Sequence, residues 1–337
     1  MAGVPGLDGS SSATENRRLP TVSVGTFRSL AVVSLAFSVL IVLSGAAVRL
    51  SGSGLGCPDW PSCYKTQFTP QLSYHPVIEF GNRMVTVVIV IVFAATLVAA
   101  YRRRPQRRDL IWLSWGLVAG VLAQAAVGAV VIYTKLNPYV VMGHFLASML
   151  LIVDALVLVH RSTRRYGPGT GALVVPRPVL LLGRGLLALL GLVLAAGTAT
   201  TGAGPHAGGN QGQLVAKRIP IALRDMAELH STLAMLLIGV TISLAVLLHA
   251  LDVPERVRRG ARVLTLVLVA QAAVGYAQYF SHLPALLVEL HVLGATSILI
   301  GSVQLYLAFA RHPAEVTAPQ AATTDQEAVP AGALGHP

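Results

Sequence analysis

Four polar positions inside apolar stretches of the chain carry residue types that are suited to chemistry. His230 and His291 lie in the second half of the sequence, and His144 and Asn82 lie in the first half. Imidazole is the commonest side-chain ligand of metal ions in proteins. A polar side chain buried among apolar residues needs a partner, so each of these positions is a candidate functional site.

The histidines belong to an internal repeat. The segment 124–128, QAAVG, recurs as segment 271–275, and His144 and His291 follow the two copies at the same distance. A sequence that repeats itself over half its length predicts one structural unit that occurs twice.

The composition indicates which elements must position these residues. The chain has 337 residues, of which 54% are hydrophobic and only 12% are charged, and its mean hydropathy is +0.67. A soluble protein of this length cannot bury so much apolar surface, so we expect a polytopic membrane protein. Continuous apolar runs favour helices over a β-barrel. We expect eight spans, near 28–48, 77–100, 110–133, 139–160, 178–200, 224–249, 262–281 and 285–310.

The net charge of +11 is a topology signal. Arginines cluster before the first span, in the links after the second, fourth and sixth spans, and after the eighth, whereas the other connections carry few. Basic residues favour the cytoplasmic side, so this pattern predicts that both termini are cytoplasmic. No stretch combines basic and aromatic residues, so we expect no nucleic-acid partner; the lipid bilayer is the expected surrounding.

The repeat and the spans together define the expected organisation, an all-α integral membrane protein with two repeated four-helix bundles. We expect the halves at 26–163 and 178–311, joined by a cytoplasmic linker at 164–177. The segments 1–25 and 312–337 are rich in small residues and proline, which predicts disorder.

The second half offers two ligands at equal depth. The positions of His230 and His291 follow the outer ends of their spans by a few residues, which places them roughly 10 Å deep at a rise of 1.5 Å per residue. Helices six and eight of an antiparallel bundle can face each other. Two imidazoles in this arrangement are suited to the axial positions of a heme iron.

The first half differs, because Asn82 stands where the second half has His230. Asparagine is a poor iron ligand, so this half offers at most one strong axial ligand, His144. An open position would suit a transient substrate. The alternative is a degenerate half with a structural role only.

Glu79 lies three residues before Asn82, so both lie on one face of the second span. A carboxylate inside the membrane is costly unless it is used or paired. It is therefore expected either to accept protons or stabilise charge beside a substrate, or to form a salt bridge with Arg83 or Arg49. Arg83 is in turn a candidate partner for a heme propionate.

Two further candidates lie in the outer loops. Cys57 and Cys63 are the only cysteines, and on the oxidising side they are expected to form a disulfide. That bond would be either a loop staple or a redox-active pair. His206 follows a glycine-rich turn, TGAG at 201–204, and either hydrogen-bonds a propionate or has no role.

Taken together, these features resemble the heme A synthase family. The resemblance covers about residues 26–311 and is carried by the two four-span halves, CPDWPSC at 57–63, EFGNR at 79–83, TGAGPHAG at 201–208, and the three histidines. The family pattern in the acid motif is Glu-x-x-His-Arg, from which Asn82 departs.

The resemblance implies a bacterial plasma-membrane oxidoreductase that converts heme O to heme A, by oxidising a ring methyl to formyl, for assembly of a terminal oxidase. It further implies an iron-containing heme b on His230 and His291, and heme O near His144 and Glu79. Heme O synthase and terminal oxidase assembly factors are the implied protein partners.

Two other classes compete with this interpretation. A diheme b-type electron-transfer protein would also place histidines on facing helices, but it would want four ligands, and Asn82 counts against it. A transporter would also show internal repeats. In many transporters these are inverted, whereas halves with four spans each enter the membrane from the same side.

Overall fold

The computed structural model describes residues 21–163, 173–211 and 214–310, and within these ranges the fold is helical apart from one short hairpin. The predicted linker core and both predicted disordered termini lie largely outside the described residues. The elements are α1 (Val24–Leu50), α2 (Tyr74–Arg102), α3 (Arg108–Tyr133), α4 (Pro138–Ser162), α5 (Arg177–Ala203), β1 (Asn210–Gln211), β2 (Leu214–Val215), α6 (Leu223–Ala250), α7 (Glu255–Phe280) and α8 (Ala285–Leu307).

All eight helices are long and apolar enough to cross a membrane, which confirms the predicted spans and fold class. Large apolar side chains cover the outside of the bundles; Ile91 and Leu266, for example, are 63% and 69% exposed. Polar backbone groups are satisfied within each helix, so such a surface is suited to hydrocarbon. The protein is therefore a multi-pass membrane protein.

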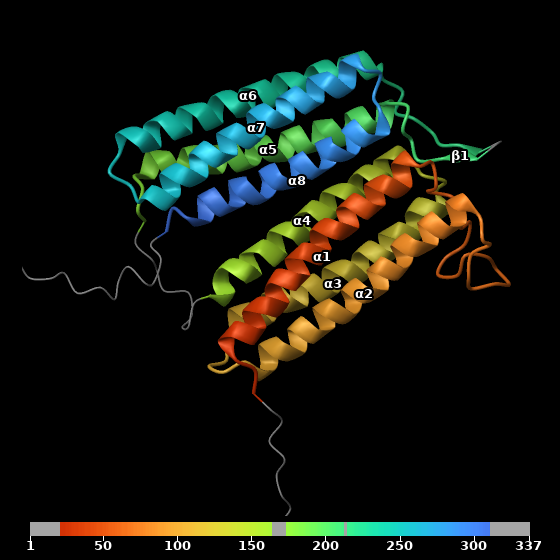
Figure 1. The fold of residues 1–337 in the computed structure, drawn as a ribbon, viewed down its shortest axis with the longest axis horizontal. Coiled ribbons are helices and arrows are strands. Elements are labelled where there is room, and N and C mark those ends of the chain that lie inside the picture. Colours follow the sequence, from red (N-terminus) through yellow and green to blue (C-terminus); the bar gives the residue numbers. More distant parts are fainter. Residues whose placement is uncertain (1–20, 164–172, 212–213, 311–337) are drawn as a thin grey trace, which may run out of the picture.

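The helices form two four-helix bundles that lie side by side (Figure 1). In the first bundle, α1 packs against α2 and α4, and α3 packs against the same two helices. In the second bundle, α5 and α7 have the same relation to α6 and α8. Consequently α2 lies across from α4, and α6 lies across from α8. This is the arrangement expected for the helices that carry Asn82 and His144, and His230 and His291.

The bundles meet through α1, α4, α5 and α8. The loops that the charge pattern assigns to the outside all lie at one end of the bundles. At this end α1 and α5 finish and α2, α4, α6 and α8 begin. We call it the outer end. There the Gly54 N–H donates to the Gly208 carbonyl, and the Arg49 guanidinium donates to the Thr201 and His206 carbonyls at 3.0 and 2.7 Å. These bonds join the outer ends of the two bundles.

Candidate functional site: two repeated ligand positions

A repeated turn starts the helices that carry His144 and His291. Lys135 and Leu136 precede α4 with φ of 52° and 60°, and His282 and Leu283 precede α8 with φ of 65° and 61°. Such values are uncommon in residues other than glycine, so their recurrence at equivalent places shows that the duplication extends to backbone conformation. Proline follows both turns within two residues, at Pro138 and Pro284, and favours the start of a helix.

A repeated hydrogen bond then fixes the height of each ligand helix. The amide of Gln124 on α3 donates to the His144 carbonyl at 2.8 Å, and that of Gln271 on α7 donates to the His291 carbonyl, also at 2.8 Å. The two glutamines therefore bridge neighbouring helices at equivalent places in the two bundles. Because the bond ends on the ligand residue itself, any sliding of α4 on α3, or of α8 on α7, would break it.

In the second bundle, the structure brings His230 and His291 together with ring centres 6.1 Å apart. Two imidazoles that share one metal ion place their ring centres about 6 Å apart, since each metal–nitrogen bond is about 2 Å long. The His230 ring pairs through Nδ1 with the Val193 carbonyl on α5 at 3.1 Å, which leaves Nε2 available. A backbone partner of this kind fixes the ring orientation of a ligating histidine. The pair therefore fits two axial ligands of one heme iron.

Glycines give these two rings their space. A Cβ on Gly197 of α5 would lie 2.8 Å from His230 Cε1, and a Cβ on Gly275 of α7 would lie 3.2 Å from His291 Cε1. The first distance is shorter than real Cβ contacts. Gly197 is therefore required for the present position of the His230 ring.

In the first bundle, Asn82 is held by Ser44 of α1, whose hydroxyl donates to Asn82 Oδ1 at 2.7 Å. Across the bundle, His144 Nδ1 is buried and has no hydrogen-bond partner among the described residues. Gly128, the repeat partner of Gly275, again lies beside the histidine ring: a Cβ on Gly128 would lie 3.9 Å from His144 Cε1. The first bundle thus reproduces one ligand position of the second bundle and replaces the other by an amide.

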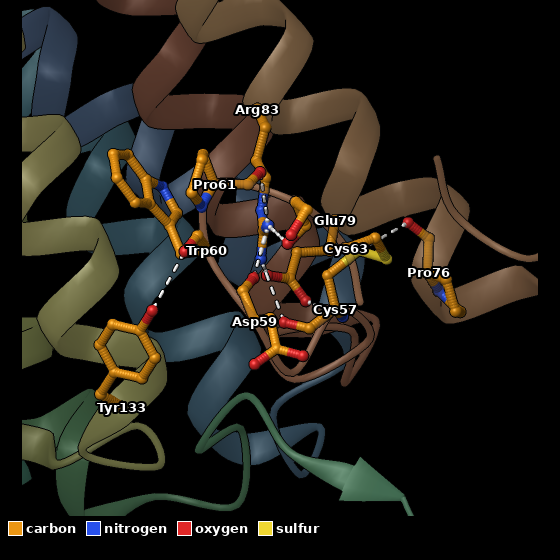
Figure 2. Close-up of polar contacts among 10 residues, drawn as sticks. Cys57, Asp59, Trp60, Pro61, Cys63, Pro76, Glu79, Arg83 and Tyr133 are labelled. Carbon is orange, nitrogen blue, oxygen red and sulfur yellow. Dashed lines mark hydrogen bonds and ion pairs between the residues drawn. A yellow bond between two sulfur atoms is a disulfide. The ribbon is translucent and has the colours of Figure 1, made fainter. Parts of the chain in front are cut away.

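Glu79 and Arg83 hold the outer loop of the first bundle onto α2 (Figure 2). The Glu79 carboxylate is 6% exposed and accepts from the Cys57 N–H and from Arg83, both at 2.6 Å. Arg83 also donates to the carbonyls of four loop residues, Cys57, Asp59, Pro61 and Ser62. Of the two predicted partners of Glu79, Arg83 forms the salt bridge. The other hydrogen bonds of the Arg83 guanidinium go to loop carbonyls.

The loop itself is closed by the predicted disulfide between Cys57 and Cys63. Tyr133, at the end of α3, donates to the Trp60 carbonyl at 3.1 Å and attaches the loop to a second helix (Figure 2). The Cys57 N–H joins the disulfide directly to the Glu79 carboxylate. The loop is therefore a rigid cover over the outer end of the first bundle.

His206 occupies the corresponding place over the second bundle. Its Nε2 pairs with the Leu283 carbonyl at 2.8 Å, and it lines a cavity of about 60 Å³ together with Thr200, Gln278 and Val288. Val288 and Gln278 lie one turn from His291 and Gly275 respectively, so the cavity lies at the outer mouth of the two-histidine site. His206 is thus at the predicted heme edge, and its bond joins the loop before β1 to the turn before α8.

Sequence reasoning missed several functional partners. Ser44 and Val193 have ordinary residue types and gain their significance from the side chains that they contact. No role for Asp154 or Glu289 follows from the sequence, and each has one buried carboxylate oxygen that lacks a hydrogen bond within the described ranges. An acidic residue in an apolar stretch was the signal available for both.

Known proteins resemble this chain in sequence. Heme A synthase of Geobacillus kaustophilus (strain HTA426) is 37% identical over 133 residues, which cover 38% of this chain and 41% of that protein. Heme A synthase of Geobacillus thermodenitrificans is 35% identical over 142 residues, or 40% and 43% of the two chains. That of Shewanella oneidensis is 31% identical over 151 residues, or 39% and 44%. The alignments therefore span less than half the length of these relatives.

The family comparison covers far more of the chain. Residues 28–303 match the family COX15-CtaA, described as cytochrome oxidase assembly protein. They include every helix from α2 to α7, the repeated polar positions of both bundles and the disulfide loop. With its bacterial relatives and eight apolar helices, the chain is a multi-pass protein of the bacterial cell membrane. It belongs to the COX15-CtaA family.

Proposed function

We propose that this protein is a heme A synthase, which oxidises one ring methyl of heme O to a formyl group. The observation that carries the proposal is the His230–His291 pair, with ring centres 6.1 Å apart, in a chain of this family. Relatives that are named heme A synthase support the same activity. The farnesyl chain of heme O is apolar, which accounts for a site inside the membrane.

In this proposal, His230 and His291 hold a resident heme b. When bound, heme b supplies one-electron transfer between the substrate site and an outside acceptor. Val193 and Gly197 orient the His230 ring, and Gln271 sets the height of His291. The His206 loop, which lies over the mouth of this bundle, keeps water away from the heme edge.

The first bundle is the proposed substrate site. His144 binds the iron of heme O from α4, and Gln124 holds that helix in place. Conversion of the methyl to a formyl group with water as the oxygen source removes four electrons and four protons, and the electrons go to the outside acceptor. Glu79, one turn from Asn82 on α2, is the proposed carboxylate that stabilises the positive charge and accepts protons. Arg83 pairs with this carboxylate at 2.6 Å and fixes it at the rim of the bundle.

Heme extraction tests the proposal directly. The full chain is expressed in a membrane that makes heme O but lacks its own heme A synthase, and extracted hemes are separated and identified as pyridine hemochromes. We expect heme A to appear, together with heme b that copurifies with the protein. Permanent binding of two b hemes without any heme A would instead support the diheme electron-transfer protein and refute the proposal.

A further inference from the structure

We propose that Ser44 is a positioning residue of the first bundle, which holds the Asn82 amide so that its N–H groups face the open axial position of a heme bound by His144 alone. This inference rests on the proposed function, because it concerns the substrate heme. It assigns to the first bundle an iron with five ligands and a hydrogen-bond donor opposite His144, in contrast to the six-ligand iron of the second bundle.

The first step of the argument is the position of Asn82. Helices α2 and α4 lie across the first bundle from each other, as α6 and α8 do in the second. His144 and His291 are anchored by the same glutamine-to-carbonyl bond of 2.8 Å. Since His230 reaches a ring distance of 6.1 Å from His291, the equivalent position on α2 also faces His144.

The second step is the chemistry of the amide. Asn82 Oδ1 accepts the Ser44 hydroxyl at 2.7 Å, whereas the Ile41 carbonyl lies farther from the same hydroxyl, at 3.3 Å. A serine hydroxyl carries one hydrogen, so the shorter contact takes it. With Oδ1 occupied on the α1 side, the Nδ2 hydrogens are the free groups of the side chain, and Nδ2 has no acceptor among the described residues. An amide nitrogen of this kind does not ligate iron.

The third step is what such a pocket does. The polarity and the hydrogen-bond donors opposite the axial histidine decide how a heme treats a small ligand. An N–H donor stabilises the partial negative charge of a water or diatomic ligand at the open position. In the second bundle, His230 fills that position and uses its own Nδ1 on the Val193 carbonyl, so it needs no counterpart of Ser44.

Carbon monoxide is the probe that tests this inference, because it binds ferrous heme with an open axial position and is excluded by two firmly bound imidazoles. The purified full chain is loaded with heme O, reduced, and exposed to carbon monoxide. We expect the gas to bind the first-bundle heme only, and the low-spin heme of the second bundle to remain as an internal standard of folding.

Four variants separate the roles. Asn82→His should abolish carbon monoxide binding and convert the ferric high-spin signal to low spin. Asn82→Leu should keep binding but raise the C–O stretching frequency, since the donor is lost. Ser44→Ala should shift that frequency in the same direction by a smaller amount. Ser38→Ala is the matched control, because the Ser38 hydroxyl donates to the Ser34 carbonyl in the same helix, and it should leave the spectrum unchanged.

Three results would overturn the inference. The first is a wild-type protein with two low-spin hemes that does not bind carbon monoxide. The second is a C–O frequency that falls in Asn82→Leu, which would mean that the amide oxygen faces the iron. The third is a Ser44→Ala spectrum identical to wild type. Each is independent of the proposed function, whose failure appears as missing heme A in extracts.

Discussion

The two bundles share a scaffold and differ at the ligand that α2 and α6 supply. Both have the left-handed turn before the fourth helix of the bundle, the glutamine that binds the histidine carbonyl, and a glycine beside that histidine. The second bundle completes the pair with His230, whereas the first places Asn82 there and adds a serine to hold it. In the proposed function, this difference separates a site for a permanent cofactor from a site for a substrate that must react and leave.

Removing the histidines of the second bundle should break this comparison most completely. His230→Ala or His291→Ala leaves one imidazole, so we expect loss of the low-spin heme b signal in the purified protein. His144→Ala should keep that signal and lose heme O binding. Low-spin spectra and membrane protein level are measured together, and a low-spin heme b that survives the double variant His230→Ala/His291→Ala would refute the ligand assignment.

Glu79→Gln should affect only the first bundle. The variant keeps the size of the side chain but loses its charge and one of the two oxygens that accept from Cys57 and Arg83, and general-base help is worth roughly 10²–10⁴-fold. We expect the ratio of heme A to heme O to fall by about 10²-fold, with heme b unchanged. Glu228→Gln is the control, because Glu228 also forms an i,i+4 pair, in the reverse order with Arg224, on an exposed surface where such pairs contribute little. Wild-type conversion by Glu79→Gln would leave the carboxylate with its loop-holding role alone.

Gly197→Ala sharpens the comparison within the second bundle. The new methyl group would lie 2.8 Å from His230 Cε1, so the ring must tilt away from the Val193 carbonyl. We expect a shifted low-spin spectrum and weaker heme b retention during purification, while heme O binding is unchanged. Gly191→Ala, in the same helix but with open space around its Cα, should match the wild type. Equal spectra for the two variants would contradict the role given to Gly197.

The disulfide should have the smallest effect, confined to the first bundle. Replacing both cysteines by serine removes a crosslink between residues six positions apart in the sequence. The lost loop-closure entropy corresponds to a loss of about 2 kcal/mol in the free energy of unfolding. We expect a lower unfolding temperature, with heme A still formed because Arg83 continues to hold the loop. Loss of heme A at a normal protein level would instead favour the redox-active pair, and thiol alkylation before and after reduction reports the state of the bond.

The sequence was sufficient for the spans, the duplication and the ligand candidates, because these depend on hydropathy and on residues that recur. It placed the start of α7 near 262, whereas the helix begins at Glu255. The first two turns of α7 are charged, and Glu255 pairs with Arg258 and Arg262, so the helix extends beyond its apolar part. Hydropathy detects only the apolar part.

The contacts of the site were less accessible. That Arg83 would bind four loop carbonyls, or that Ser44 would meet Asn82, depends on how α1 and the outer loop fold over α2. Arg49 was one of two alternative partners expected for Glu79, but its donors reach the Thr201 and His206 carbonyls of the other bundle. Backbone carbonyls have no sequence signature, so such partners follow only from the tertiary structure.

The contacts between the two bundles are symmetric. The contact of α1 with α8 is matched by that of α5 with α4, and α4 meets α8, its own repeat partner. Exchanging the two bundles leaves this set of contacts unchanged, which is the property of an isologous interface in a twofold symmetric dimer. A four-helix ancestor that paired with itself would produce this arrangement once its gene was duplicated and fused. Such a fusion would allow each copy to change alone, which is the condition for Asn82 and His230 to differ.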